Sequence, residues 1–551
     1  MNYTLDTSLK DQHYLSITLE VTTPKSETFL QLPAWRPGRY ELGNFAKNIQ
    51  HFEVVNEKGE KVTYQKTSKD RWKVDTQQTD LIRVTYSYYS IDFNAGSTYL
   101  GEHVLYVNPV NCFLYVPEEM DKTCTVEIPV GKHEKIACGV PFESGKITTR
   151  NFHELADTPF LVSSQLQSQH YESHGVTVTI WFYGECKPEW TKVIEDFKQF
   201  TDYQIQQFGG FPTNHYHFIN IIHPHKAYHG VEHTTSTVIV LGPSYEVMNE
   251  RYVDLLGVSS HELYHAWNIK SIRPAEMNPY DYTKENYSKL GYVAEGVTTY
   301  MGDLMLFESG VFNKKDYENE LNQYLRRHYT NGGRLNKSVA DSSFDTWLDG
   351  YTLGAPDRKS SIYIEGALIS FMIDTNIRQA TDNQYTLHDV MAELYEQFGK
   401  TSTGYTESDY RSIIERLSGV SFKSFFEDYI WGTKDFTEEL SKCFAQRGFQ
   451  FTKSPSELAT ERFGILLKPE ETNKAVVMHI APNSAAWEAG LAREDTILSV
   501  NGLLLDNNLN QWLGYFEHSD IELEVAKGNH LRKVKLSAPN QNQFWTYTVK
   551  G

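Results

Sequence analysis

The strongest constraint on the fold is a change in hydrophobic period along the chain. Up to about residue 170, short runs such as HYLSITLEV (13–21) and DLIRVTYSYYSI (80–91) alternate apolar and polar residues between turn signals, as strands do. Between 250 and 450, apolar residues recur every three or four positions, as in YVDLLGVSSHELYHAW (252–267). This pattern is typical of helices. The sequence therefore predicts a multidomain α+β protein in which an antiparallel β-domain precedes a mostly helical domain.

Two further transitions divide the chain. A strand pattern, VTVTIWFYG (176–184), leads into an amphipathic helix at 188–209, and the polar stretch TKSPSELATER (452–462) has the composition of a linker. A unit of short strands with one short helix follows. A chain of 551 residues has room for several domains. We expect three, over residues 1–172, 173–452 and 461–551.

Charge and cysteine content restrict the partners and the location. The formal net charge of −19 disfavours nucleic acid and an anionic membrane surface as partners. No apolar stretch approaches the roughly 18 residues that span a bilayer, and the N-terminus has no signal-peptide pattern. The five cysteines are scattered and form no CxxC pair, which indicates free thiols in a reducing compartment. The expected location is cytoplasmic, with a truncated secreted form as the alternative.

The helical region contains the pattern His261-Glu262-Leu263-Tyr264-His265. Positions four apart on a helix share a face, so His261 and His265 can both reach one metal ion. Glu262 lies beside them, where it can polarise a water molecule without binding the metal. The alternative is a pair of surface histidines. However, the flanking residues are apolar, and burying these three side chains without partners is costly.

A catalytic zinc site needs a third protein ligand and an open position. Glu295, in GYVAEGVTTYMGDLML (291–306), is the best candidate because it begins the next helical segment among small and apolar neighbours. The alternative is a solvated glutamate at a helix N-terminus, where the helix dipole favours it.

These segments resemble a known family. HELYHAWNIKSIRP (261–274) followed by YVAEGVTTY (292–300) resembles the glycyl aminopeptidase family of gluzincin zinc metallopeptidases, with its HExxHxWNxKxxRP and EGxTxY patterns. The resemblance implies that His261, His265 and Glu295 bind one zinc ion per chain, within a thermolysin-like catalytic domain. LPAWRPGRYELGNFAKNIQ (32–50) is similar to the family's β-domain motif, although its residues alone favour a rigid packed loop.

Two more segments carry the resemblance into the substrate site. AYHGVEHTTSTVIV (227–240) is similar to the family's GxEH motif, which implies that Glu232 binds the free α-ammonium group of a peptide and that Gly230 lets the peptide backbone approach. SSIYIEGALISFMIDTNIR (360–378) resembles a helix whose tyrosine, Tyr363 here, donates a hydrogen bond to the oxyanion; Glu365 stands where lysine is usual. The alternatives are an ordinary strand end and a core tyrosine. We do not predict a second metal site at the histidines upstream of Glu232.

The C-terminal unit resembles a PDZ domain through FGILL (463–467) and VVMHIAPNSAAWEAGLAREDTILSVNG (476–502). PDZ domains add the C-terminal segment of a partner to a sheet edge. Gly464, Ile465 and Leu466 occupy the position of the loop that binds the carboxylate, although the usual GLGF is altered. A purely structural role is the alternative.

The sequence thus predicts a zinc-dependent aminopeptidase that removes N-terminal residues, with glycine and other small residues implied by the family. Glu262 is the expected general base. The alternatives are a gluzincin endopeptidase and an inactive scaffold that binds peptides through its PDZ unit.

Overall fold

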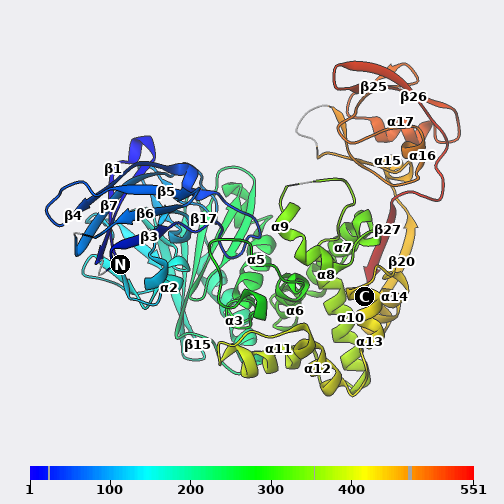
Figure 1. Cartoon of the computed structure of the whole chain (residues 1–551). Coiled ribbons are helices and arrows are strands. Elements are labelled where there is room, and N and C mark those ends of the chain that lie inside the picture. The colour runs from blue at the N-terminus through cyan, green and yellow to red at the C-terminus, as the bar shows by residue number, and fades with distance from the viewer. Residues whose placement is uncertain (23–24, 78, 353, 470–473) are drawn as a thin grey trace.

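The computed structural model of the chain has a β-rich N-terminal domain, a mixed central region and a small C-terminal unit that projects from the helices on a narrow ribbon (Figure 1). It describes residues 1–22, 25–77, 79–352, 354–469 and 474–551. The architecture is therefore α+β and multidomain, as the change of hydrophobic period predicted.

Three sheets build the N-terminal domain. The largest has the strand order β12-β13-β10-β1-β2-β7-β4. Its strands are β1 (Asn2–Leu9), β2 (Tyr14–Thr22), β4 (Ile49–Asn56), β7 (Leu81–Tyr89), β10 (Cys124–Glu127), β12 (Phe142–Glu143) and β13 (Lys146–Thr149). The alternation predicted for 13–21 is present in β2, where every second residue from Leu15 to Val21 is buried in the domain's core. Smaller sheets are formed by β3 (Glu27–Gln31), β6 (Arg71–Asp75) and β5 (Tyr64–Ser68), and by β11 (Lys135–Cys138), β14 (Phe160–Ser163), β9 (Leu105–Val107) and β8 (Tyr99–Leu100).

The central region begins with a five-stranded sheet of order β15-β16-β17-β19-β18. Its strands are β15 (Gln167–Ser173), β16 (Val176–Tyr183), β17 (His215–Ile222), β18 (Ala227–Glu232) and β19 (Ser236–Gly242). This sheet starts at Gln167, before the expected boundary at 173, because β15 pairs with β16 along its whole length. Its last member, β18, pairs with β19 and has no other strand beside it among the described residues. That free edge faces the candidate site.

Helices complete the central region: α3 (Trp190–Phe208), α5 (Tyr252–Tyr264), α6 (Thr298–Glu308), α7 (Lys314–Tyr329), α10 (Ile364–Ala380), α11 (Leu387–Leu394), α12 (Glu407–Ser418) and α14 (Thr437–Gln446). Capping boxes start three of them, at Asn313 before α7, at Thr386 before α11 and at Thr406 before α12. A wider turn with π-helical hydrogen bonding, Tyr292–Val297, leads directly into α6. Helices α5, α6 and α10 lie together in one large hydrophobic core.

The C-terminal unit has its own core around Phe463, Val477 and Leu523. It contains β21 (Ile465–Leu467), β22 (Ala475–Ile480), β23 (Thr496–Val500), β25 (Ile521–Lys527) and β26 (His530–Leu536), in that order across the sheet, with α16 (Ala485–Glu488) and α17 (Leu509–Tyr515).

The stretch at 452–462 is not an unstructured linker. It contains the end of β20 (Gln450–Pro455) and the helical turn α15 (Ala459–Arg462). Strand β27 (Trp545–Lys550) returns from the C-terminal unit and pairs antiparallel with β20, and Figure 1 shows this pair as the ribbon that joins the unit to the helices. The C-terminal end of the chain therefore lies against the helical region, where Gly551 N donates to Glu318. Among the described residues, no helix is both long enough and apolar enough to cross a membrane.

Candidate active site

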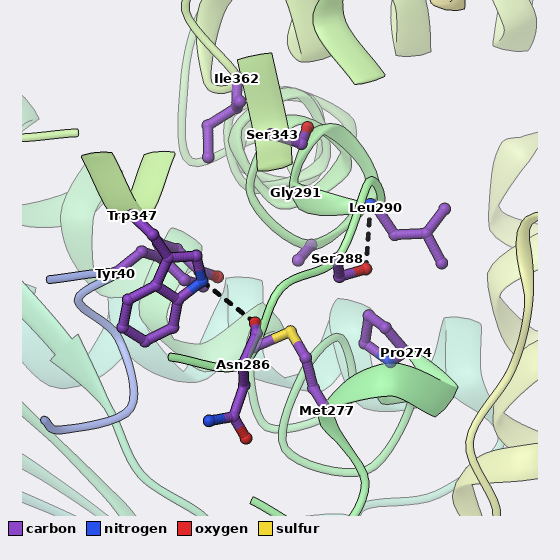
Figure 2. A pocket seen from close by; sticks show the side chains of 11 residues that line it. Tyr40, Pro274, Met277, Asn286, Ser288, Leu290, Gly291, Ser343, Trp347 and Ile362 are labelled. Carbon is purple, nitrogen blue, oxygen red and sulfur yellow. Dashed lines mark hydrogen bonds between the residues drawn. The ribbon is translucent and has the colours of Figure 1, made fainter. Parts of the chain in front are cut away.

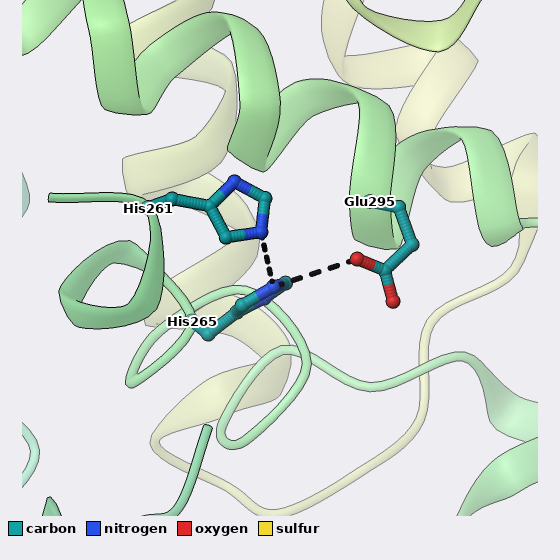
Figure 3. Close-up of side chains that lie close together, drawn as sticks. All are labelled: His261, His265 and Glu295. Carbon is teal, nitrogen blue, oxygen red and sulfur yellow. Dashed lines mark hydrogen bonds and ion pairs between the residues drawn. The ribbon is translucent and has the colours of Figure 1, made fainter. Parts of the chain in front are cut away.

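The two segments predicted to hold a metal come together (Figure 3). His261 and His265, at the end of α5, have their Nε2 atoms 3.0 Å apart. Glu295 projects from the π-helical turn before α6, with Oε2 3.5 Å from His265 Nε2. Ligand atoms of all three residues lie within 4.8 Å of one another. Two imidazoles and a carboxylate form one of the donor sets found in catalytic zinc sites.

The residues after the second histidine fix this arrangement. His265 Nδ1 lies 2.8 Å from the backbone oxygen of Asn268, so its Nε2 is directed toward the other ligands. The side-chain nitrogen Nδ2 of Asn268 donates to the backbone oxygens of Val293 and Ala294, at 2.8 and 3.2 Å. Asn268 thereby joins the helix end that holds the histidines to the turn that holds Glu295.

A residue that the sequence analysis missed binds the remaining oxygen of Glu295. The Tyr40 hydroxyl donates to Glu295 Oε1 at 2.8 Å, while Oε2 faces the histidines. Tyr40 belongs to the N-terminal segment 32–50, which the residues alone favoured as a packed loop. Figure 2 shows Tyr40 beside Trp347, whose indole Nε1 donates to the backbone oxygen of Asn286, in the lining of a small cavity next to the turn. The loop is packed, as expected, but it also contributes to the site.

Charge also favours a cation at this point. Burial and the neighbouring His265 hold the pKa of His261 well below its usual range. Burial lowers the pKa of His265 too, but the hydrogen bond and charge of Glu295, with the charges of Glu232 and Glu262, outweigh it and raise this pKa to about 10. The His261 imidazole is therefore neutral, and the neighbouring carboxylates stabilise a positive charge on His265. A divalent cation would satisfy the same demand.

The Glu262 carboxylate is buried and incompletely hydrogen-bonded. It is 5% exposed, and among the described residues its Oε2 has no hydrogen-bond partner. Burial raises its pKa well above the usual range, and the charge of His265 opposes this. Gly230 on β18 lies directly over it, because a Cβ atom there would be 2.0 Å from Glu262 Oε1. A buried carboxylate with a free oxygen is suited to proton transfer.

Glu232 ends β18 beside these groups. Its carboxylate lies within 4.8 Å of ligand atoms of Glu262 and His265. Gly38, in the same N-terminal loop as Tyr40, packs against it, since a Cβ atom there would be 2.5 Å from Glu232 Oε2. Gly38 also has a φ of +78°, so both space and conformation favour glycine.

The neighbouring residue, His233, anchors this strand end to the N-terminal domain. Asp157 Oδ1 lies 3.1 Å from His233 Nδ1 and 2.7 Å from Lys270 Nζ, and Asp157 Oδ2 accepts from the backbone of Thr234. Burial raises the pKa of Asp157, but the charge of Lys270 and the hydrogen bond from His233 outweigh it and hold this pKa well below its usual range. The Asp157 network thus connects β18, the segment after the metal ligands and the N-terminal domain.

Residues of the metal cluster and of the β18 edge line one cavity of about 550 Å³. Its lining includes the three metal-ligand candidates and Gly38, Gly230, Glu232, Glu262 and Tyr363. Tyr363 stands immediately before α10, and burial followed by the charge of Glu295 raises its pKa. Glu365, the residue found where lysine is usual, turns away from the cavity and lies 3.0 Å from His328 Nδ1. The unusual glutamate therefore belongs to the core.

The remaining candidates lie outside the group of metal-ligand candidates, although His229 lines the same cavity of about 550 Å³ and Leu466 lines a second cavity together with Tyr363. Gly464, Ile465 and Leu466 are at the start of the edge strand β21 in the C-terminal unit, and Gly464 has a φ of +84°. Of the upstream histidines, His215 and His217 line a separate cavity. Among the described residues, the metal-capable groups contain none of those histidines. All five cysteines are buried free thiols.

Comparison with known families fits this site. A model of the peptidase M61 N-terminal domain matches residues 2–164, and a model of the M61 glycyl aminopeptidase matches residues 254–369, which contain all three ligand candidates and Tyr363. The chain belongs to the M61 family of glycyl aminopeptidases. It is thus a metallopeptidase of the aminopeptidase type.

One solved structure is similar over the whole length of this chain. An aminopeptidase N family protein from Idiomarina loihiensis shares 25% sequence identity and a TM-score of 0.91, with 100% of this chain and 97% of that chain covered. An M1 zinc metallopeptidase mutant from Deinococcus radiodurans, bound to a Tyr-Ser-Ala substrate, shares 13% identity and a TM-score of 0.49, over 79% of this chain and 94% of that one. A comparison with curated protein sequences gives no match.

Proposed function

We propose that this M61 protein is a zinc-dependent aminopeptidase that hydrolyses the first peptide bond of peptides with free N-termini. The observation that carries the proposal is the convergence of His261, His265 and Glu295 at the base of a cavity that also contains Glu232 and the unpartnered Glu262. A preference for glycine and other small N-terminal residues is part of the proposal and rests on the family.

One zinc ion per chain would be held by His261, His265 and Glu295. The fit rests on two facing imidazoles, a carboxylate whose other oxygen is already held by Tyr40, and surrounding negative charge. When bound, zinc supplies Lewis acidity to the scissile carbonyl and to the attacking water. The choice of zinc over other divalent metals rests on the types of the ligands, two imidazoles and a carboxylate.

Glu262 would move the proton. Glu262 lines the cavity and its Oε2 has no hydrogen-bond partner among the described residues, so the carboxylate could accept a proton from the attacking water and then deliver it to the leaving amine. Burial raises its pKa, which brings it nearer to the pH at which a general base works well. The Tyr363 hydroxyl, protonated because its pKa is raised, would donate to the developing oxyanion.

Glu232 would decide which bond is cut. A peptide added to the free edge of β18 would present its α-ammonium group to this buried carboxylate, with the first peptide bond over Glu262. The close packing of Gly38 on Glu232 limits the room at this end of the cleft. Both features favour removal of a single small residue over cleavage within a chain.

The C-terminal unit has a separate proposed role. We propose a division into a β-domain, a peptidase domain that begins with β15 (Gln167–Ser173) and extends to residue 452, and a PDZ domain (461–551). The edge strand β21, preceded by Gly464 in a left-handed conformation, is the element that would accept the C-terminal segment of another peptide.

Hydrolysis of matched peptides tests the proposal. Purified protein with about one zinc ion per chain should cleave Gly-Ala-Ala and leave N-acetyl-Gly-Ala-Ala intact, and Glu262→Gln should abolish cleavage while retaining zinc. Equal cleavage of both peptides would indicate an endopeptidase instead. Absence of cleavage by a zinc-loaded protein would indicate an inactive scaffold. Glu232→Gln should raise KM for the free peptide far more than it changes the zinc content.

A further inference from the structure

The cleft has an orientation that its contacts define. It runs between the edge strand β18 and helix α5. At one end, Gly230 lies over Glu262; at the other, Arg251, just before α5, donates to the backbone oxygen of Ala227 at 3.0 Å. The strand and the helix therefore run side by side, with Glu232 near the metal ligands and Tyr228 toward the start of α5.

A peptide anchored at Glu232 would extend toward Tyr228. Gly230 and Tyr228 are two residues apart on a strand, which corresponds to about 7 Å. The part of the peptide that follows the scissile bond would then lie along Tyr228 and the first two turns of α5. Residues that line the cavity at this end would contact the second and third residues of the substrate.

Three acidic side chains line this end: Asp254 on α5, Asp303 on α6 and Glu320 on α7. Asp303 Oδ1 would lie 3.8 Å from a Cβ atom at Gly257, one helical turn before His261. Desolvation and then the charges of Asp303, Asp254, Glu320 and Glu262, in that order, raise the pKa of the Tyr228 hydroxyl. For Tyr363, at the other end, the corresponding carboxylates are Glu295 and Glu232. The acidic group therefore affects Tyr228 more than the metal-site carboxylate Glu262 does, whereas Glu295 and Glu232 affect Tyr363.

Within the described part of the chain, only one of these three acids has a counter-ion, because Asp254 Oδ2 lies 2.7 Å from Arg251 Nε. Asp303 accepts a hydrogen bond from Tyr324 and Glu320 accepts from Gln323, but within the described part of the chain neither forms an ion pair. Burial, together with like charges for Glu320, raises the pKa of Asp303 to about 7 and that of Glu320 to about 8. Both carboxyls are therefore partly protonated near neutral pH, and a bound cationic group would favour their charged forms. Arg327 also lines the cavity but is exposed and, in the same described part, unpaired with these acids.

A metal ion is not the expected occupant of this end. Among the described residues, the clusters whose ligand atoms lie within 4.8 Å of one another do not include Asp254, Asp303 or Glu320. A long cationic side chain, in contrast, can meet separated carboxylates in turn. The three acids share this cavity with Glu262, which is buried and whose Oε2 has no hydrogen-bond partner among the described residues, so a peptide that reaches Glu262 would also pass along the acids.

We propose that the acidic end of the cleft binds a cationic side chain, so that the enzyme prefers peptides with lysine or arginine at the second or third position. This inference rests on the proposed aminopeptidase function, which sets the direction of the peptide. It adds a specificity determinant on the leaving side of the scissile bond. Because the acids are partly desolvated, the preference is expected to be about tenfold in kcat/KM at low salt and to weaken as salt is added.

The test compares Gly-Lys-Ala, Gly-norleucine-Ala and Gly-Glu-Ala, which differ at the second residue only. The wild type should cleave the lysine peptide about tenfold better than the norleucine peptide and the glutamate peptide worst. Glu320→Gln should reduce the lysine preference, and Asp303→Asn with Glu320→Gln should remove it. Glu195→Gln, which removes an exposed charge on α3, should leave the preference intact.

Binding separates this inference from the proposed function. Calorimetry with the Glu262→Gln variant measures affinity for the same three peptides without turnover, and the lysine peptide should again bind about tenfold more tightly. If the wild type cleaves none of the free peptides, the aminopeptidase proposal fails, while the affinities still test the acidic end. If cleavage occurs but the lysine and norleucine peptides are cleaved and bound equally, the inference about the acidic end is overturned and the aminopeptidase proposal stands.

Discussion

The Tyr40 hydroxyl offers a sharp test of how the N-terminal domain supports the metal site. Its hydrogen bond to Glu295 Oε1 is 2.8 Å long, and Tyr40 and Glu295 are only 6% and 3% exposed, so water cannot easily replace it. A hydrogen bond to a charged acceptor contributes about 1.5–3 kcal/mol. Partners that orient metal ligands typically contribute 10–100-fold in metal affinity or activity. Tyr40→Phe removes the hydroxyl and keeps the ring against Trp347.

We therefore expect Tyr40→Phe to weaken zinc binding by about 10–100-fold, measured by competition with a chelator at constant pH. A smaller fall in kcat at saturating zinc should accompany it. Tyr64→Phe is the matched control, because Tyr64 donates to the backbone oxygen of Phe52 in the same domain, on an exposed surface. Unchanged zinc affinity in Tyr40→Phe would refute the reasoning. An equal loss in both variants would point to general destabilisation instead.

Three other substitutions test separate parts of the site. Gly230→Ala places a Cβ atom 2.0 Å from Glu262 Oε1 and should lower kcat at least tenfold, whereas Gly514→Ala, where the nearest atom is 3.7 Å away, should leave steady-state kinetics unchanged. Asp157→Asn should lower the free energy of unfolding at pH 7 by about 3 kcal/mol. Because the folded pKa of Asp157 lies below its usual 3.8, the stabilisation is present above pH 3.8 and is lost as the pH falls below it. Urea titrations should therefore show the free energies of unfolding of wild type and variant converging in acid. A difference that stays constant with pH would contradict this. Asn268→Asp turns a donor to two backbone oxygens into an acceptor and should lower the melting temperature and the zinc content together; an unaltered zinc content would exclude its role in joining the two segments.

Local spacing made part of the site predictable. His261 and His265 share a helix face because they are four residues apart, and Glu295 stood out because a lone carboxylate among apolar residues needs a partner. The hydrogen bond of Tyr40 to Glu295 spans 255 positions, and no periodicity reports a contact of that length. Its available signal was the unusual segment WRPGRY, whose similarity to a family motif indicated more than a packed loop.

The fold followed the hydrophobic period, but composition misled at 452–462. Polar residues and a proline suggested a linker, yet β20 continues to Pro455 because β27, about ninety positions later, supplies its partner. Strand pairing of that kind depends on where the chain returns, which local composition does not encode. The same holds for Glu365, whose partner His328 comes from another helix.

The pairing of β20 with β27 has a consequence for how this chain can be altered. Pro455, where the chain leaves the helices, stands directly opposite Trp545, where it comes back. Neighbouring antiparallel strands are separated by only about 5 Å. A short turn could therefore connect Pro455 directly to Trp545 in place of the whole segment between them. Replacing the C-terminal unit with a short turn would therefore leave the path of the peptidase chain unchanged, and would remove the ion pairs of Glu461 with Arg326 and of His479 with Asp357.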